Sequence, residues 1–225
     1  TVLVQDGRIL RVGQNGIAPA DATVYELQGL HLWPGLVEPY SDLGMPAPDG
    51  NGQPKPAGAR FWNPAVHPAV QAVRYYAPDE DKAASLRAQG FATVITHRMD
   101  GVARGTSCAV LLGGRNANQD IIAPDASAHF SFSKGSSKDA YPSSLMGSIA
   151  LVRQALYDAR WYTMQGRREQ SDADLQALQE RLDLPLVFEA SDRNDVLRIA
   201  SIGREFGLRF IVKGAGDEYA RLGDI

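Results

Sequence analysis

Apolar and polar residues alternate at the start of the chain. An apolar run before the Asp-Gly pair at 6–7 and an alternating run at 8–12 read as two short strands, and Asp-Gly is typical of a tight turn between them. Residues 23–27 and 30–33 continue the β pattern until the Pro-Gly pair at 34–35 ends it. This region is therefore expected to form a small β domain.

A long loop, a helix and a strand are predicted next. Residues 44–68 contain so many Pro and Gly residues that regular elements are excluded, which predicts a loop. Residues 78–90 begin with acidic groups, which favour the positive end of the helix dipole, and end at a glycine, so they predict a helix. The continuously apolar run 91–96 predicts a buried parallel strand.

The segment 101–142 yields no predicted helix. Gly, Ser, Asn and Asp surround two short apolar runs there, at 109–112 and 121–123, and His129 falls outside any predicted element. From residue 143 the pattern becomes helical, because serines that can cap a helix precede apolar residues that recur on one face over about 17 residues.

Strands and helices alternate in the C-terminal part. In chain order the predicted elements are a helix at 171–182, a strand at 184–189, a helix at 192–206, a strand at 208–212 and a helix that begins at Asp217. Strands that follow one another through helices pair in parallel with right-handed crossovers. The fold class is therefore predicted to be α/β.

Composition is that of an ordinary globular protein, with 44% hydrophobic and 22% charged residues among 225. A net charge of -3 gives no basic surface for a nucleic-acid backbone, and no apolar run reaches the ~18 residues of a membrane span. We expect a soluble protein with neither nucleic acid nor membrane as partner, in the cytoplasm or, after signal removal, in the periplasm. Cys108, the only cysteine, is expected in the core.

Residues 33–43, WPGLVEPYSDL, and the preceding hairpin pattern DGRI..VG resemble the amidohydrolase superfamily, specifically its imidazolonepropionase-like cyclic amidohydrolases. Residues 142–162 and 184–225 resemble the same group. The resemblance implies a small β-sandwich portion of a composite domain in residues 1–35, and an incomplete TIM-type (β/α)8 barrel in residues 36–225. The pattern offers only about five barrel-type strands, against the eight of a closed barrel.

The same resemblance bears on metal binding. In that family, histidines at the ends of barrel strands hold zinc or iron, and the metal turns water into hydroxide. Carried over position by position, Tyr40 and Asp42 replace the His-x-His pair of the first strand, while Glu189 and Lys213 replace histidines of two later strands. A phenol and an ammonium group are poor ligands because each must first lose a proton. No metal is therefore expected in this segment; if one binds, its ligands are Asp42 and Glu189.

The candidate pocket consists of Tyr40, Asp42, His97, Glu189 and Lys213, with no catalytic residue assigned among them. His97 directly follows a predicted strand, at the end where barrel sites lie. It is either a substrate-contacting or general-acid residue, or a histidine that is hydrogen-bonded at a junction between strand and loop.

Three functions are compatible with these residues. The first is a catalytically degenerate, structural segment of an amidohydrolase-type protein, a hydrolase of non-peptide carbon–nitrogen bonds. The second is a divergent metal-dependent amidohydrolase in which carboxylates hold an ion such as Mg²⁺ or Mn²⁺. The third is a module that binds a small molecule in the pocket where that family binds its metal. An unclosed barrel exposes strand edges, so a continuation of the same polypeptide or a homo-oligomer partner is expected to cover them.

Overall fold

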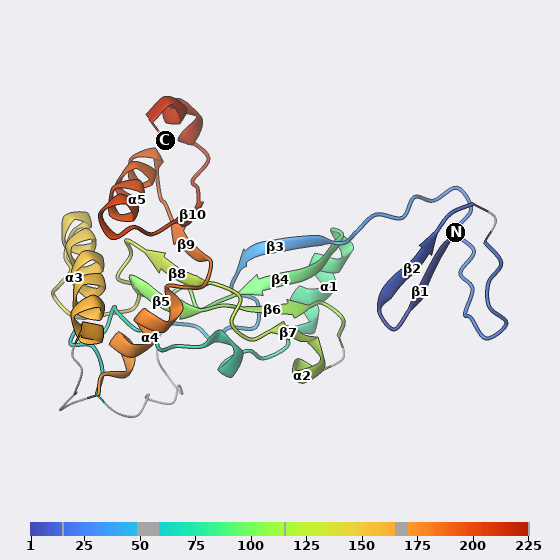
Figure 1. Cartoon of the computed structure of the whole chain (residues 1–225), viewed down its shortest axis with the longest axis horizontal. Coiled ribbons are helices and arrows are strands. Elements are labelled where there is room, and N and C mark those ends of the chain that lie inside the picture. Colours follow the sequence, from blue (N-terminus) through green and yellow to red (C-terminus); the bar gives the residue numbers. More distant parts are fainter. Residues whose placement is uncertain (15, 49–58, 115, 165–170, 225) are drawn as a thin grey trace. The chain divides into compact units, whose positions relative to one another are not determined.

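The computed structural model describes residues 1–14, 16–48, 59–114, 116–164 and 171–224 of the chain (Figure 1). The chain divides into two units, Thr1–Pro34 and Gly35–Ile225. The first contains a β-hairpin and the second contains two four-stranded sheets with their helices.

The hairpin of the first unit confirms the prediction from its sequence. β1 (Val2–Gln5) pairs antiparallel with β2 (Arg8–Val12). The turn between them uses φ angles of 50° at Asp6 and 72° at Gly7. An Asp-Gly pair is suited to this turn because both residue types tolerate positive φ better than most.

The strands expected at residues 23–27 and 30–33 are not formed. In the described part of this unit neither β1 nor β2 pairs with them, and their apolar side chains remain uncovered: Leu30 is 70% exposed and Trp33 is 80% exposed. A β-prone sequence becomes a strand only where neighbours pack against it. A β-sandwich in this region stays a prediction.

One sheet of the second unit has the strand order β3-β4-β6-β7. Its strands are β3 (Leu36–Ser41), β4 (Phe91–Thr96), β6 (Cys108–Leu111) and β7 (Ile121–Ala123). β3 and β4 are parallel, whereas β6 is antiparallel to both of its neighbours. The strand predicted at 91–96 is therefore confirmed, but it is parallel to only one neighbour.

The helix α1 (Glu80–Ala88) packs on this sheet and confirms the helix predicted from the acidic start. The carboxylate of Asp79 caps it by accepting a hydrogen bond from the backbone N–H of Lys82. Ala83 of the helix and Cys108 of β6 belong to one buried cluster, so the lone cysteine lies in the core as expected.

The other sheet has the order β10-β9-β8-β5. Its strands are β5 (Ala103–Thr106), β8 (Ala128–Ser131), β9 (Leu186–Glu189) and β10 (Phe210–Lys213). β8, β9 and β10 run parallel, and β5 is antiparallel to β8. The predicted strands at 184–189 and 208–212 and their parallel pairing are confirmed.

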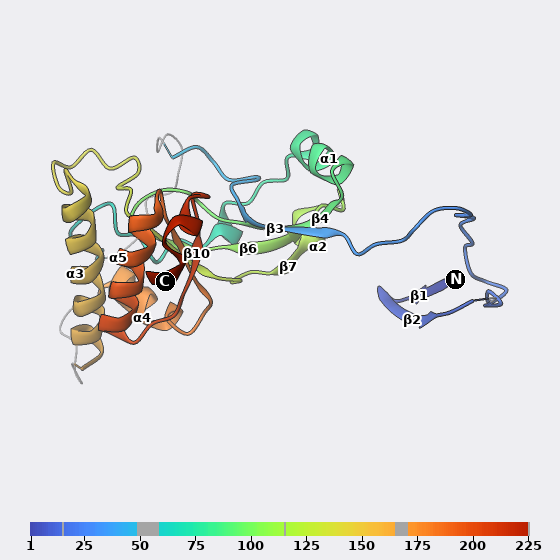
Figure 2. The ribbon, with the colours of Figure 1, turned by 90° about the horizontal axis from the view of Figure 1, so that it is seen from above.

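Three helices lie together on one side of this sheet (Figures 1 and 2). They are α3 (Leu145–Met164), α4 (Ala173–Arg181) and α5 (Arg193–Phe206). The carboxylates of Asp172 and Asp192 cap α4 and α5, as their sequences predict. Their apolar faces bury the larger core, which includes Leu151, Leu178, Phe188, Ile199 and Ile202.

The remaining helical elements are short. They are η1 (Ala72–Arg74), α2 (Ala117–Asp120) and η2 (Glu218–Asp224), the last at the position where a helix was predicted to begin at Asp217. The architecture is therefore α/β with mixed sheets, which confirms the predicted α/β class, whereas the incomplete TIM-type barrel stays a prediction.

The segment 101–142, in which no helix and no named strand was predicted, contains four strands and the short helix α2. The two apolar runs noted in the sequence are β6 and β7. β5 and β8 escaped prediction because each is four residues long and carries buried polar side chains, such as those of Arg104 and His129. Hydrogen bonds make such burial possible, and the sequence pattern does not reveal them.

The predicted loop 44–68 contains no helix or strand in its described parts, and residues 49–58 lie outside the described residues. Asp174 on α4 anchors the second part of the loop. Its buried carboxylate accepts hydrogen bonds from the backbone N–H groups of Phe61 and Ala69 and pairs with Arg60 at 3.1 Å. The loop is thus tied to the second sheet's helices.

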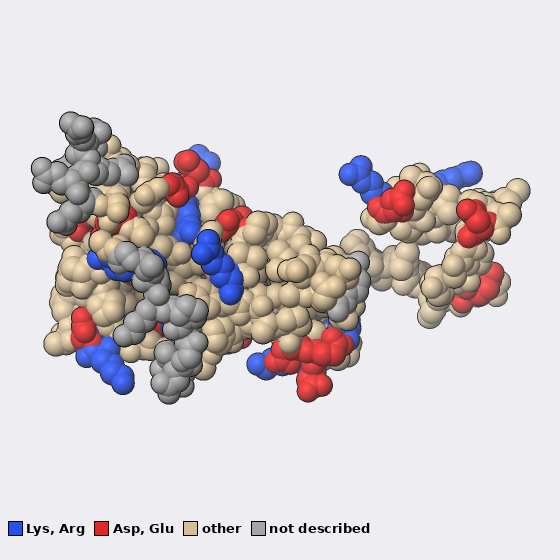
Figure 3. All heavy atoms as spheres, turned by 90° about the horizontal axis from the view of Figure 1, so that it is seen from below, with Lys and Arg blue, Asp and Glu red and all other residues tan. Residues whose placement is uncertain are grey.

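Two surface properties bear on the expected partners. Among the described residues, no helix combines the length and hydropathy needed to cross a bilayer. On the face shown in Figure 3, Lys and Arg side chains are scattered among Asp and Glu and do not gather into one basic patch.

Gly207 allows a direct test of the end of α5. It has a φ of 67°, and a Cβ added there would meet nothing within 4 Å, so an alanine would suffer backbone strain alone. We expect Gly207→Ala to lower the free energy of unfolding by about 1 kcal/mol in urea denaturation. Gly223→Ala is the control, because its surroundings are equally open and its φ is not positive. Equal losses in the two variants would contradict this explanation.

Candidate functional site

Six side chains from both sheets of the second unit meet near the C-terminal ends of several strands. This central cluster consists of Tyr40, His97, Arg104, His129, Glu189 and Lys213. Four of the six were predicted from the sequence, and Arg104 and His129 were not. Because Tyr40 belongs to the first sheet and Glu189 to the second, the cluster joins the two sheets.

Arg104 on β5 is the centre of the cluster. Its side chain is only 4% exposed. Nη1 donates a hydrogen bond to the Tyr40 hydroxyl at 2.7 Å, Nη2 lies 2.9 Å from Oε2 of Glu189, and Nε donates to the carbonyl of Gly101 at 3.1 Å. A buried guanidinium is tolerated only when acceptors surround it, and these three acceptors meet that need.

Glu189 also pairs with Lys213. The two residues are register partners on the parallel strands β9 and β10, and Nζ of Lys213 lies 3.7 Å from Oε1 of Glu189. The same ammonium lies 5.5 Å from the ring centroid of Tyr40, within the range of a cation–π contact. The Lys213 side chain is 42% exposed and that of Glu189 is 27% exposed, so this side of the cluster reaches solvent.

The two histidines form a buried stack. The ring centroids of His97 and His129 are 3.6 Å apart with an interplanar angle of 17°, and Tyr40 meets His97 edge-on at 4.7 Å. Nε2 of His129 lies 2.9 Å from Oγ of Ser127, which in turn lies 2.7 Å from Oγ of Ser107. Nδ1 of His129 and both ring nitrogens of His97 have no hydrogen-bond partner among the described residues.

Burial fixes the protonation state of this stack. It lowers the pKa of His97 to about 2, with the neighbouring His129 and then Arg104 adding to the effect. Burial, followed by the charge of Arg104, lowers the pKa of His129 to about 3. Burial likewise raises the pKa of the Tyr40 phenol. At neutral pH both imidazoles are therefore uncharged, and Tyr40 keeps its proton.

Asp42 does not join the cluster through any contact. It follows β3 as an exposed residue, and its backbone carbonyl accepts a hydrogen bond from Met45 N–H. Its carboxylate forms neither an ion pair nor a hydrogen bond with the described residues. The structure thus brings together Tyr40, Glu189 and Lys213 from the carried-over positions, and His97 from its place after a strand.

Of the two residues that sequence reasoning missed, only His129 left a weak signal. His129 alternates with Phe130 and Phe132, the period-two pattern of a strand, so its side chain faces away from the phenylalanines. That alternation could have placed His129 on a strand face. Nothing in the pattern around Arg104 indicated that a charged residue would be buried there.

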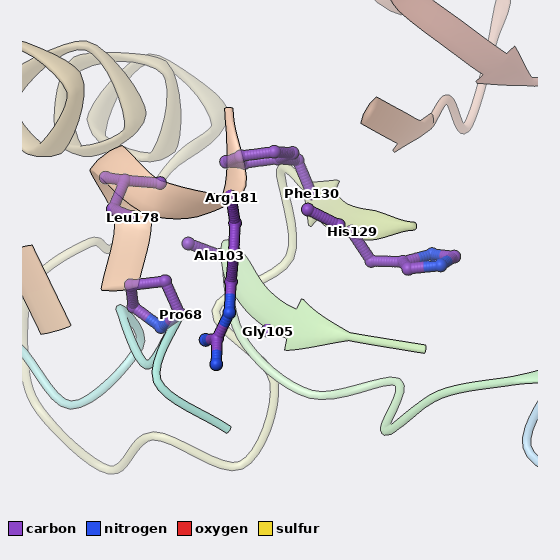
Figure 4. Close-up of a pocket in the computed structure, with 8 residues that line it drawn as sticks. Pro68, Ala103, Gly105, His129, Phe130, Leu178 and Arg181 are labelled. Atoms are coloured by element: carbon purple, nitrogen blue, oxygen red, sulfur yellow. The ribbon is translucent and has the colours of Figure 1, made fainter. Parts of the chain in front are cut away.

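A small cavity lies on the other side of β8. Its volume is about 10 Å³, room for about one water molecule, and Pro68, Gly105, Leu178 and Arg181 are among its lining residues. Figure 4 shows the Arg181 guanidinium near Pro68 and Gly105, whereas the His129 imidazole points away from them. His129 thus lines both the cavity and the central cluster, but its imidazole lies on the side of the cluster.

The central cluster does not fit zinc or iron. Among the described residues, no three His, Cys, Asp or Glu side chains are arranged to hold a metal ion. The carboxylate of Glu189 is already paired with a guanidinium and an ammonium group, and the guanidinium also lies close enough to lower the pKa of both imidazoles. A divalent cation at this point would face two fixed positive charges.

Comparison with known proteins gives one structural likeness. No protein-family model and no curated protein sequence matches the chain. The crystal structure of an amidohydrolase from Thermotoga maritima MSB8 matches 94% of this chain with a TM-score of 0.72 and 22% sequence identity. This chain spans 58% of the length of that protein. The chain therefore has the fold of part of an amidohydrolase, which confirms the resemblance at the level of fold.

Arg104 can be tested against a surface arginine. Arg104→Met leaves the carboxylate of Glu189 and the hydroxyl of Tyr40 without their buried donor, so we expect the free energy of unfolding to fall by about 3 kcal/mol. Arg153→Met is the matched control, because Arg153 pairs with Glu205 at the exposed surface. A smaller loss is expected there, since exposed pairs contribute little. Similar losses in urea denaturation would contradict a central role for Arg104.

The stacked histidines predict a pH dependence of stability. Their pKa values in the folded chain lie below the ~6.5 of an unfolded imidazole. Between these values the unfolded chain therefore binds more protons than the folded chain. The contribution of the two histidines to the free energy of unfolding should be fully present above pH ~6.5. It should decline as the pH falls toward about 3, by up to about 1.4 kcal/mol per pH unit for each histidine.

The variants His129→Phe and His97→Phe should each remove part of this decline in urea denaturation at a series of pH values. His31→Gln serves as the control, because His31 is an exposed residue of the first unit. If the decline were unchanged in both phenylalanine variants, the two buried imidazoles would not be its source.

Proposed function

We propose that this chain is a structural, catalytically silent segment of an amidohydrolase-type protein, of the imidazolonepropionase-like group. In this proposal residues 36–225 are part of a TIM-type barrel, and residues 1–35 contribute to a composite β-sandwich. The parent activity is hydrolysis of a non-peptide carbon–nitrogen bond. The single observation that carries the proposal is the position of Arg104, whose guanidinium pairs with Glu189 and donates to Tyr40.

In this proposal the guanidinium of Arg104 supplies a positive charge as a metal ion would, but it cannot bind and activate water. Metal-dependent hydrolysis requires a cation with an open position, where water can bind and lose a proton near neutral pH. A guanidinium only donates hydrogen bonds and has no position where water can bind and lose a proton, and this one is directed at Tyr40, Glu189 and Gly101. It balances the carboxylate of Glu189 and activates no water.

The other members of the central cluster do not supply a general base. A general base is most effective when its pKa lies near the working pH. The pKa values of about 2 for His97 and about 3 for His129 make both imidazoles very weak bases. Tyr40 holds its proton because burial raises its pKa, and Lys213 carries a charge paired with Glu189. The cluster is thus suited to holding two sheets together.

One observation favours a second candidate, a divergent metal-dependent amidohydrolase. The exposed carboxylate of Asp42 has no ion pair with the described residues and is free to take a ligand such as Mg²⁺ or Mn²⁺. A small-molecule binding module is the third candidate, supported by the exposed ammonium of Lys213 at the solvent side of the cluster.

Metal analysis of the purified chain separates these functions. After exposure to Zn²⁺ or Mn²⁺ and removal of loose ions, we expect no stoichiometric metal, and no hydrolysis of cyclic amides or dipeptides with or without added Mn²⁺. If the chain bound one equivalent of metal, and if Asp42→Ala but not Asp81→Ala abolished this binding, the proposal would be wrong and the second candidate would be supported. Asp81 is suitable as the control because it is an exposed carboxylate on α1.

A further inference from the structure

The turn between β1 and β2 combines exposure with an uncommon backbone conformation. Asp6 and Gly7 are both exposed, and Asp6, with a φ of 50°, is the only residue other than glycine that has a positive φ among the described residues. The Asp6 carboxylate has no hydrogen-bond or ion-pair partner in the described part of the chain, and the N–H of Gly7 donates to no acceptor there. Both groups are therefore free to react.

An aspartate followed by glycine can rearrange without an enzyme. The backbone nitrogen of the glycine attacks Cγ of the aspartate, and one carboxylate oxygen leaves as water with the amide proton and a proton from solvent. Solvent water then opens the resulting cyclic imide. Attack at Cγ restores aspartate, whereas attack at the backbone carbonyl carbon yields isoaspartate, in which the chain continues through Cγ. The water lost in the first step is regained in the second, so nothing is oxidised or reduced.

The surroundings of Gly7 favour this attack. A glycine has no Cβ, so other atoms can approach its nitrogen closely. A Cβ added at Gly7 would meet nothing within 4 Å, so the space beside the turn is open to the carboxylate and to water. Exposed loop tips also change their conformation at lower cost than packed segments do.

A second Asp-Gly pair of the chain has the opposite surroundings. Asp100 is 2% exposed, and its carboxylate accepts hydrogen bonds from the N–H and Oγ of Ser136 at 2.6 and 2.8 Å. It also pairs with Arg98 at 2.9 Å. Attack by the nitrogen of Gly101 requires that these contacts loosen first, so the fold protects this pair. The remaining Asp-Gly pair, at 49–50, lies outside the described residues.

We propose that Asp6 is a site of spontaneous isoaspartate formation, whereas Asp100 stays aspartate in the folded chain. The rearrangement inserts one extra methylene into the backbone between Gln5 and Arg8, which are register partners at the turn. The two-residue turn then no longer matches the twist of the strands that it joins. The modification thus opens the β1–β2 hairpin. It is independent of the central cluster, which belongs to the second unit.

Incubation of the whole chain at neutral pH and body temperature tests the proposal. Digestion and electron-transfer mass spectrometry then distinguish isoaspartate from aspartate at each site. We expect isoaspartate to accumulate at Asp6. At least about tenfold less is expected at Asp100, because that pair reacts only when its surroundings open. In urea, where the chain is unfolded, the two sites should react at rates within about twofold of each other.

Three results would overturn the proposal. The first is the absence of isoaspartate at Asp6 in the folded chain, and the second is an equal amount at Asp6 and Asp100. The third is a large difference between the two sites that persists in urea, because it would arise from the neighbouring sequence and not from the fold.

A substitution at Gly7 tests the direct attack by its nitrogen. Asn tolerates a positive φ better than most residues, but its side chain obstructs the nitrogen, so Gly7→Asn should lower the yield of isoaspartate at Asp6 by about fivefold. Gly13→Asn is the matched control, because Gly13 lies in the same unit and its surroundings are equally open. This variant should leave the yield unchanged, and an equal fall in both variants would contradict direct attack.

Amide hydrogen exchange tests the opening of the hairpin. Residues 2–12 should exchange faster in chains that carry isoaspartate at position 6 than in unmodified chains, whereas β4 of the second unit should be unaffected. Unchanged exchange in residues 2–12 would show that the hairpin survives the modification.

Discussion

The burial of one guanidinium group organises the second unit. Arg104 is 4% exposed, and it satisfies its donors with groups from three separate parts of the chain: the Tyr40 hydroxyl, the Glu189 carboxylate and the Gly101 carbonyl. A buried cation without such acceptors would be strongly unfavourable. The positions of β3 and β9 relative to β5 are therefore constrained by a single side chain, and the ends of both sheets are held together around it.

The same charge determines the chemistry of its neighbours. It pairs with the carboxylate of Glu189 and disfavours protonation of His97 and His129, which burial already opposes. Uncharged imidazoles can stack at 3.6 Å beside a guanidinium, whereas charged ones would repel it and each other. The neutral phenol of Tyr40 and the carboxylate of Glu189 are thus electrostatically consistent with a fixed organic cation at this point.

Local signals predicted the helices well and the buried polar residues poorly. The helix starts predicted near residues 78, 171 and 192 are confirmed, and Asp79, Asp172 and Asp192 cap these helices, because capping is a short-range interaction. β5 and β8 were missed because their four-residue spans contain Arg104 and His129. These polar residues can be buried only because partners from distant parts of the chain contact them. Tyr40, Glu189 and Lys213 were found by resemblance and His97 by its place after a strand, while Asp42, assigned by resemblance, makes no contact with them.

The central cluster and the exposed apolar surfaces differ in how far the chain itself satisfies them. Every partner of Arg104 belongs to residues 35–225, so the geometry of the cluster needs no further polypeptide. The edge of β10 is different: its backbone groups and the 59% exposed Ile211 gain favourable contacts only when another segment covers them. In the first unit, the hairpin likewise leaves Ile9 and Val12 at 65% and 70% exposed, and an isolated two-stranded hairpin has little stability. The charge balance is therefore satisfied locally, whereas apolar side chains of β10 and of the hairpin remain exposed.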